Sequence, residues 1–125
     1  MNQVINNPYK EKLKRLMDDY VQLAYEISKN FPKSEIYGVT SQYRRSTMSI
    51  ILNYIEGFAR RKKPVQLNFF EISYGSLSES KYLLSFVYKQ NWIDEVVFLK
   101  GKKYTNEIGA MLWREITNLD SKINS

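Results

Sequence analysis

The stretch SIILNYIEGFARRKKP, residues 49–64, contains the end of one helix and the start of the next. Its large apolar residues recur at the spacing of one helix face and are expected in the core: Ile51, Tyr54, Ile55 and Phe58. Four consecutive cations and Pro64 follow; proline cannot continue a helix but can occupy the first turn of another. We name Arg60, Arg61, Lys62 and Lys63 the basic turn.

The same helical periodicity marks most of the chain, and no segment shows the alternation of a strand. We predict helices at residues 8–30, 41–62, 65–90 and 95–119, with a short helical turn at 34–37. Thr40 and Asp94 are expected N-caps, and Gly101 is a possible interruption of the last helix. Long helices with short connections favour an all-α, antiparallel up-down-up-down four-helix bundle.

Length and composition favour a globular protein. The 125 residues fit a single domain, 1–125, with residues 1–7 flexible and 120–125 frayed. The first eight residues lack the cationic start and apolar core of a signal peptide, and no apolar run approaches the ~20 residues of a membrane span. We therefore expect a cytoplasmic protein with no membrane partner.

The sequence has no Cys and no His, which removes thiolate nucleophiles, imidazole bases and ordinary zinc sites. We predict no catalytic residue, no metal, no cofactor and no enzymatic activity. A metal-dependent nuclease using Glu56, Glu71 or Glu79 is a minor alternative, because these acids do not show the clustering of a two-metal site.

The charge is strongly positive, with 19 Lys and Arg against 13 Asp and Glu, a net charge of +6. This favours a polyanionic partner, although mildly basic proteins without such a ligand are common. In an antiparallel bundle the start of the first helix and the basic turn share one end. We name the eight cations there the basic pole: Lys10, Lys12, Lys14, Arg15, Arg60, Arg61, Lys62 and Lys63. Tyr9 and Gln66 could add contacts, and Lys100, Lys102 and Lys103 form a smaller patch at the opposite end.

A polar network is predicted within the bundle. Arg44 falls on the inward line of the second helix, so its charged group must either extend to the end of the bundle or pair with an acid such as Glu79, because an unpaired buried charge is costly. Asn53 and Glu56 lie on the opposite line beside Gly57, which permits close backbone approach. They form either a packed seam or a solvated face in which Glu56 pairs with Arg60.

The third predicted helix is apolar on two sides. Its second side carries Ile72, Leu83 and Phe86 together with Gly75 and Glu79. A helix of this kind requires two packing partners, so either it is central in the bundle or its second side makes a contact with another subunit or a partner protein; we favour self-association.

Two motifs resemble a known family. YGVTSQYRRSTMSIILNYIEGFARR, residues 37–61, followed by FFEISYGSLSESKYLL, residues 69–84, is similar to the four-helix-bundle proteins encoded within intervening sequences of bacterial 23S rRNA genes. Ile51 and Leu52 depart from the Pro-Ser pair of many relatives. The resemblance implies a bundle that assembles into a ring, commonly a pentamer, and a relationship to the basic accessory protein of diversity-generating retroelements, which binds nucleic acid and a reverse transcriptase. It implies no catalytic residue.

Together these observations predict a non-enzymatic, homo-oligomeric bundle, with a pentamer favoured. The bundle is expected to bind RNA or DNA through backbone phosphate contacts at the basic pole. The alternative is a protein-interaction scaffold that docks a partner through the two-sided third helix.

Overall fold

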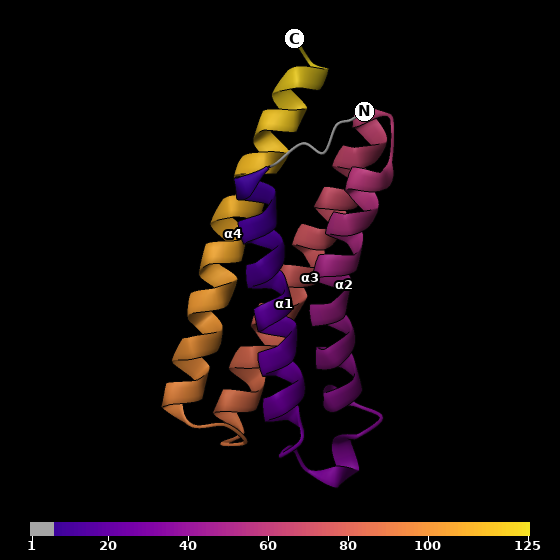
Figure 1. Ribbon diagram of the computed structural model, residues 1–125. Coiled ribbons are helices and arrows are strands. Elements are labelled where there is room, and N and C mark those ends of the chain that lie inside the picture. Colours follow the sequence, from indigo (N-terminus) through magenta and orange to yellow (C-terminus); the bar gives the residue numbers. More distant parts are fainter. Residues whose placement is uncertain (1–6) are drawn as a thin grey trace.

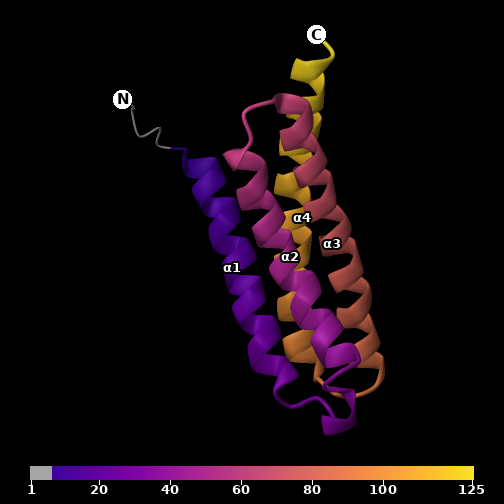
Figure 2. The ribbon, with the colours of Figure 1, turned by 90° about the vertical axis from the view of Figure 1, so that its right-hand side faces the viewer.

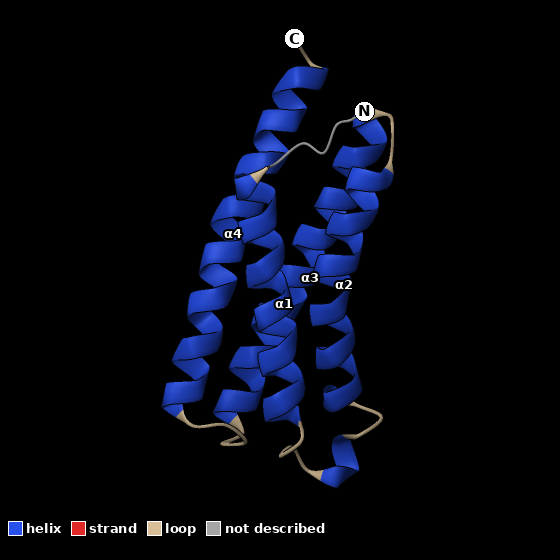
Figure 3. Ribbon diagram, in the orientation of Figure 1, coloured by secondary structure: helices blue, strands red, loops and turns tan. Residues whose placement is uncertain are grey.

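The computed structural model describes residues 7–125, which form four long helices and no strand. These are α1 (Pro8–Ser28), α2 (Val39–Ala59), α3 (Lys63–Lys89) and α4 (Glu95–Ile123), with a short 3-10 helix at Lys33–Glu35. Consecutive helices run in opposite directions (Figure 1), and helix accounts for nearly all of the described chain (Figure 3). The segment predicted to be flexible is 1–7, and residues 1–6 of it lie outside the described part of the chain. No helix within residues 7–125 has both the length and the apolar character required to cross a membrane.

The helices enclose a common core. α1 and α3 each pack against both α2 and α4, and Figure 2 shows α2 between α1 and α3 with α4 behind them. Side chains from all four long helices meet in this core, among them Leu13, Met17, Ile50, Tyr54, Phe70, Leu77, Ile108 and Leu112. Burial of these apolar groups is the main favourable term in folding.

Side-chain caps start two of the helices. The Asn7 side chain accepts a hydrogen bond from the Lys10 amide at the start of α1 (3.1 Å). Asp94 accepts one from the Val97 amide (2.9 Å), which confirms the predicted cap of α4. Each contact satisfies an amide that has no partner within the helix.

The predicted N-cap at Thr40 is wrong. α2 begins at Val39, so Thr40 lies inside the helix, where it is buried. Glu35 Oε1 accepts a hydrogen bond from the Val39 amide (N–Oε1 3.2 Å). A carboxylate from the preceding 3-10 helix therefore provides an acceptor for a free amide at the start of α2. Rules that look for a short polar residue at the N-cap position do not predict this contact.

α2 ends at Ala59 rather than at Lys62, and the chain turns sharply into α3. Arg60 is extended, and its carbonyl accepts a hydrogen bond from Gln66 Nε2 (3.0 Å). Pro64 occupies the first turn of α3, as predicted. The basic turn thus lies at the end of the bundle, between two helices.

α4 continues without interruption through Gly101 to Ile123, so residues 120–123, which were expected to fray, are helical. Gly101 is buried, and a Cβ placed there would lie 2.8 Å from a methyl carbon of Leu84. Glycine at this position therefore permits close approach of α3 and α4, which outweighs its low helix propensity.

The buried face of α2 is rotated from the predicted one. Tyr54 is buried, and Ile51 and Phe58 pack partly against the core, but Ile55 is 44% exposed, so its assignment to the core is wrong. Small residues hold the inward positions beside the large ones, and Gly57 is so close to α3 that an added Cβ would lie 2.5 Å from the Phe70 ring. Hydrophobicity alone does not reveal such small-residue contacts.

A chain of hydroxyl groups crosses the core. The Tyr43 hydroxyl donates to the Tyr20 hydroxyl (3.2 Å), which donates to Ser80 Oγ (3.2 Å), and Ser80 donates to the Leu77 carbonyl (2.8 Å). Tyr20, Tyr43 and Ser80 are all fully buried. The chain satisfies polar groups that would each cost about 1–3 kcal/mol if left without a partner.

The second apolar side predicted for α3 packs against other residues of the same chain in its C-terminal part. Leu83 is 6% exposed, and the Phe86 ring contacts Trp92 at a centroid distance of 6.0 Å. The α3–α4 turn brings Trp92 back onto the bundle; Asn91 in this turn has φ 64°, a conformation that asparagine tolerates. Ile72 keeps an exposed fraction of 43%.

Candidate nucleic-acid interface

The basic pole draws its residues from two places in the chain. The start of α1, the basic turn and the last turns of α4 all lie at one end of the bundle (Figures 1 and 2). Lys10 Nζ lies 4.2 Å from the centre of the Phe58 ring, a cation–π contact that joins the start of α1 to the end of α2. Lys10 therefore lies beside the last turn of α2, which leads into the basic turn.

The cations of the basic turn differ in their surroundings. Arg60 forms an ion pair with Glu56 (Nη2–Oε2 2.7 Å) and lies over the Phe69 ring. Arg61, Lys62 and Lys63 are exposed, and no ion pair among residues 7–125 involves them. Three adjacent charges are thus available to a ligand at the end of the bundle.

The α1 cations extend down the side of the bundle. Lys14 lies 3.9 Å from Glu11, and Lys14 and Arg15 border a shallow depression with Asp18 and Ile51. Lys12 is exposed and takes part in no ion pair within the described range. Acidic neighbours therefore moderate this part of the basic pole, whereas the basic turn keeps its charge.

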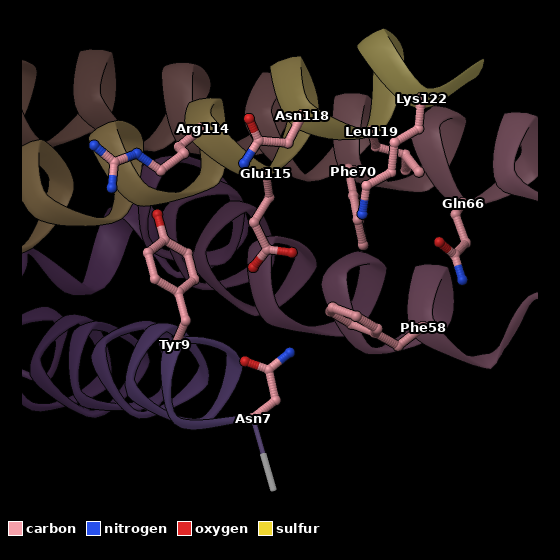
Figure 4. Close-up of a pocket in the computed structure, with 10 residues that line it drawn as sticks. All are labelled: Asn7, Tyr9, Phe58, Gln66, Phe70, Arg114, Glu115, Asn118, Leu119 and Lys122. Carbon is pink, nitrogen blue, oxygen red and sulfur yellow. The ribbon is translucent and has the colours of Figure 1, made fainter. Parts of the chain in front are cut away.

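A cavity of about 390 Å³ opens at the same end, between the start of α1, the last turn of α2, the first turns of α3 and the last turns of α4 (Figure 4). It is lined by Asn7, Tyr9, Phe58, Gln66, Phe70, Arg114, Glu115, Asn118, Leu119 and Lys122. Tyr9 and Gln66 were candidates from the sequence. The Tyr9 ring is anchored by a hydrogen bond from its hydroxyl to the Met111 carbonyl (2.9 Å).

Glu115 is the acidic group of this cavity, and sequence reasoning missed it. Burial raises the pKa of the Glu115 carboxyl, while the hydrogen bond from Tyr54 and the charge of Lys10 act to lower that pKa. The Tyr54 hydroxyl donates to Glu115 Oε1, and burial together with this contact raises the pKa of Tyr54. The signal in the sequence is the position of Glu115 three residues after Leu112 and four before Leu119, both of which are buried.

The four residues of the predicted polar network do not form one network. Arg44 Nε donates to Ser28 Oγ (2.7 Å), and its guanidinium lies 5.0 Å from the Tyr25 ring centre. Arg44 faces α1, so the expected pair with Glu79 is not formed, and Glu79 is exposed on α3. The hydroxyl of Ser28 and the ring of Tyr25 therefore accommodate this half-buried guanidinium.

The Asn53 side chain contributes to a polar contact between α2 and α3. Its Nδ2 donates to both the carbonyl and the hydroxyl of Ser49 (2.9 Å each), and Ser49 Oγ lies 2.8 Å from Ser76 Oγ. Glu56 instead faces Arg60. Part of the polar line is thus a packed seam, and the remainder is a surface ion pair.

The acidic residues of the nuclease alternative are dispersed. Glu71 and Glu79 are exposed, and Glu56 is half-buried in its pair with Arg60. Within residues 7–125 no three acidic side chains come close enough to hold a metal ion together.

Comparison with known proteins gives a family and a fold. The sequence pattern of the family described as 23S rRNA-intervening sequence protein matches residues 11–114. No curated protein matches the chain. The structure is similar to the 1.70 Å crystal structure of a protein with unknown function from the S23 ribosomal protein family of Bacteroides thetaiotaomicron VPI-5482, with a TM-score of 0.79 and 18% identity over 87% of this chain and 98% of that one. This likeness concerns the fold.

Proposed function

This chain belongs to the family of 23S rRNA-intervening sequence proteins, and from that premise we propose that it is a non-enzymatic, homo-oligomeric bundle that binds RNA or DNA. Binding is through phosphate contacts at the basic pole, and the protein acts in the cytoplasm as a single domain. The observation that carries this proposal is the set of three exposed, adjacent cations without an ion-pair partner in the described chain: Arg61, Lys62 and Lys63. Phosphate contacts from Lys and Arg supply most of the affinity in sequence-independent binding.

We further infer that the up-down-up-down bundle assembles into a ring, with a pentamer favoured by the family resemblance. The support from the structure is the apolar surface on α2 and α3, where Leu52 is 55% exposed, Ile55 44% and Ile72 43%. A ring repeats the basic turn on each subunit, so that individually weak phosphate contacts add through multivalency. Native mass spectrometry with and without RNA measures the assembly directly.

The test of nucleic-acid binding is a filter-binding titration with a structured RNA and a duplex DNA over a series of salt concentrations. The test variant is Arg61→Glu/Lys62→Glu/Lys63→Glu. The matched control is Lys100→Glu/Lys102→Glu/Lys103→Glu at the opposite end of the bundle. Each triple reversal changes the charge by three times −2 and brings the net charge from +6 to 0. Acidic residues at the start of α3 are compatible with its helix dipole, so the test variant should fold.

We expect the test variant to lose binding and the control to retain most of it. Each lost phosphate contact reduces the magnitude of the negative slope of log affinity against log salt by about 0.7–0.9. Loss of three contacts should therefore reduce the magnitude of this slope by about 2–3 for each subunit. Absence of retention of either nucleic acid at low salt would refute the proposal. Equal losses in both variants would assign the effect to net charge and not to the basic pole.

The alternative, a protein-interaction scaffold, has a smaller surface than the sequence suggested. Leu83 is buried and Phe86 packs partly against the core, which leaves Ile72, 43% exposed, as the exposed member of that side. Tyr82, which was not among the predicted residues, is 67% exposed beside Phe86 (ring centroids 6.4 Å apart). In a pull-down from cell extract, a scaffold would lose its partner on Ile72→Asp or Tyr82→Asp and keep it on reversal of the basic turn. A nucleic-acid binder gives the opposite pattern with RNA.

A further inference from the structure

The cavity at the basic pole combines apolar walls with hydrogen-bonding groups. Phe58 and Phe70 line one part of it, and Gln66 and Asn118 place amides at its border. Its volume of about 390 Å³ is that of a small-ligand pocket. Flat molecules with polar edges suit such a lining, and proteins bind unpaired nucleobases through aromatic contacts and hydrogen bonds to the base edges.

Glu115 sets the hydrogen-bonding requirement of the ligand. Tyr54 donates to Oε1, and no other hydrogen bond to this carboxylate is found within residues 7–125. Figure 4 shows the carboxylate projecting into the space between Tyr9 and Phe58. An ionised carboxylate only accepts hydrogen bonds, and its two oxygens offer about four acceptor positions. A well-fitting ligand must therefore present adjacent donors.

The border of the cavity sets the charge of the ligand. Arg114 and Lys122 line it, and Lys10 is close enough for its charge to act on Glu115. Three cations around one carboxylate disfavour a cationic ligand such as an arginine side chain. They favour a molecule that has a neutral, donor-rich part and an anionic part.

Among the common nucleobases, guanine presents two adjacent donors, N1–H and the N2 amino group, on its Watson–Crick edge. Adenine, cytosine and uracil each place an acceptor next to their donor on that edge. We propose that the cavity binds an unpaired guanine, with its Watson–Crick edge on Glu115 and its phosphate at the cationic border of the cavity. This inference rests on the nucleic-acid binding proposed above and adds base selectivity to it.

The test uses RNA hairpins that differ in one unpaired loop base, with affinities measured by fluorescence anisotropy at one salt concentration. We expect the wild type to prefer G over A, C and U by about tenfold, as a bidentate base contact gives. Glu115→Gln replaces one acceptor by a donor, so it should abolish the preference for G and raise the relative affinity for A. Glu107→Gln, also on α4 and half-buried but lining a different depression, is the matched control and should keep the preference.

A second measurement needs no variant. Calorimetric titration of the wild-type protein with GMP, AMP, CMP and UMP should show the strongest binding for GMP. Hairpins that bind with equal affinity whatever the loop base, together with no preference for GMP, would overturn the guanine site and leave the proposed function intact. Lack of binding by all hairpins at low salt would overturn the proposed function as well. A preference for GMP without one among hairpins would assign the cavity to a free nucleotide and refute its role in nucleic-acid binding.

Discussion

Gly57 provides a sharp test of how α2 and α3 are packed. A Cβ at this position would lie 2.5 and 2.8 Å from two carbons of the Phe70 ring and 3.3 Å from the Gln66 carbonyl oxygen. Phe70 is 2% exposed and its ring packs against those of Tyr54 and Phe58. The ring cannot move aside without disturbing other core residues. Gly57→Ala should therefore strain the closest contact between the two helices.

The matched control is Gly75→Ala, because Gly75 is also helical but an added Cβ there meets no atom within 4 Å. Replacing glycine by alanine in a helix stabilises by up to about 1 kcal/mol. Overpacking a core costs about 1–3 kcal/mol, and the rigid Phe70 environment places Gly57 in the upper part of that range. We expect Gly75→Ala to raise the free energy of unfolding by about 1 kcal/mol. The free energy of unfolding of Gly57→Ala should be about 2–3 kcal/mol below that of this control.

Urea unfolding at one protein concentration measures both variants, with native mass recorded so that a change of assembly is not read as a change of packing. The difference between the variants isolates the steric contribution, since both contain the same Gly→Ala change. If Gly57→Ala proves as stable as Gly75→Ala, then α2 and α3 are not as close at Gly57 as the contact with Phe70 requires.

Three further predictions concern the core and the cavity. Gly101→Ala should lower the free energy of unfolding by about 1–2 kcal/mol, and Leu84→Ala should restore part of that loss in a double-mutant cycle; additive losses would contradict the contact between them. Ser80→Ala should cost about 1–3 kcal/mol because the buried Tyr20 hydroxyl loses its acceptor, and a neutral effect in urea unfolding would argue against the hydroxyl chain. Burial raises the pKa of Glu115 in the folded state, so its favourable contribution to wild-type stability is complete below the ordinary carboxyl pKa and declines as pH rises through the raised value. Glu115→Gln does not titrate, so unfolding at about pH 4 and pH 7 should show its stability relative to wild type increasing with pH, and a constant difference would contradict the raised pKa.

The helices were predictable because their signals are local in the sequence: the spacing of apolar residues, the proline at position 64 and the capping residue Asp94. The errors come from contacts that are distant in sequence or depend on small residues. Glu35 caps α2 from a separate helical turn, so no local rule identifies it. Gly57 faces the core because α3 is close, whereas hydrophobicity favoured Ile55.

The candidate site was predictable in part for the same reason. The position of the basic pole follows from the antiparallel order of the helices, because this order brings Lys10 at the start of α1 next to Phe58 at the end of α2. The cavity requires residues 114–122 of α4, of which only Lys122 lies in the segment 120–125 that was expected to fray, and its acid is a single Glu115 beside the apolar stripe. One carboxylate on a helix resembles ordinary surface charge until the partner, here Tyr54 on α2, is known.

The hydroxyl chain from Tyr43 through Tyr20 to Ser80 also bears on the uniqueness of the fold. Aliphatic contacts are tolerant, and helices slid past one another by one turn, about 5.4 Å, could exchange one set of Leu and Ile contacts for another. The hydroxyl groups on α1, α2 and α3 do not allow this exchange, because a shift of one helix would break their hydrogen bonds. The chain therefore favours one alignment of these three helices over neighbouring ones, and that alignment places the start of α1 level with the basic turn.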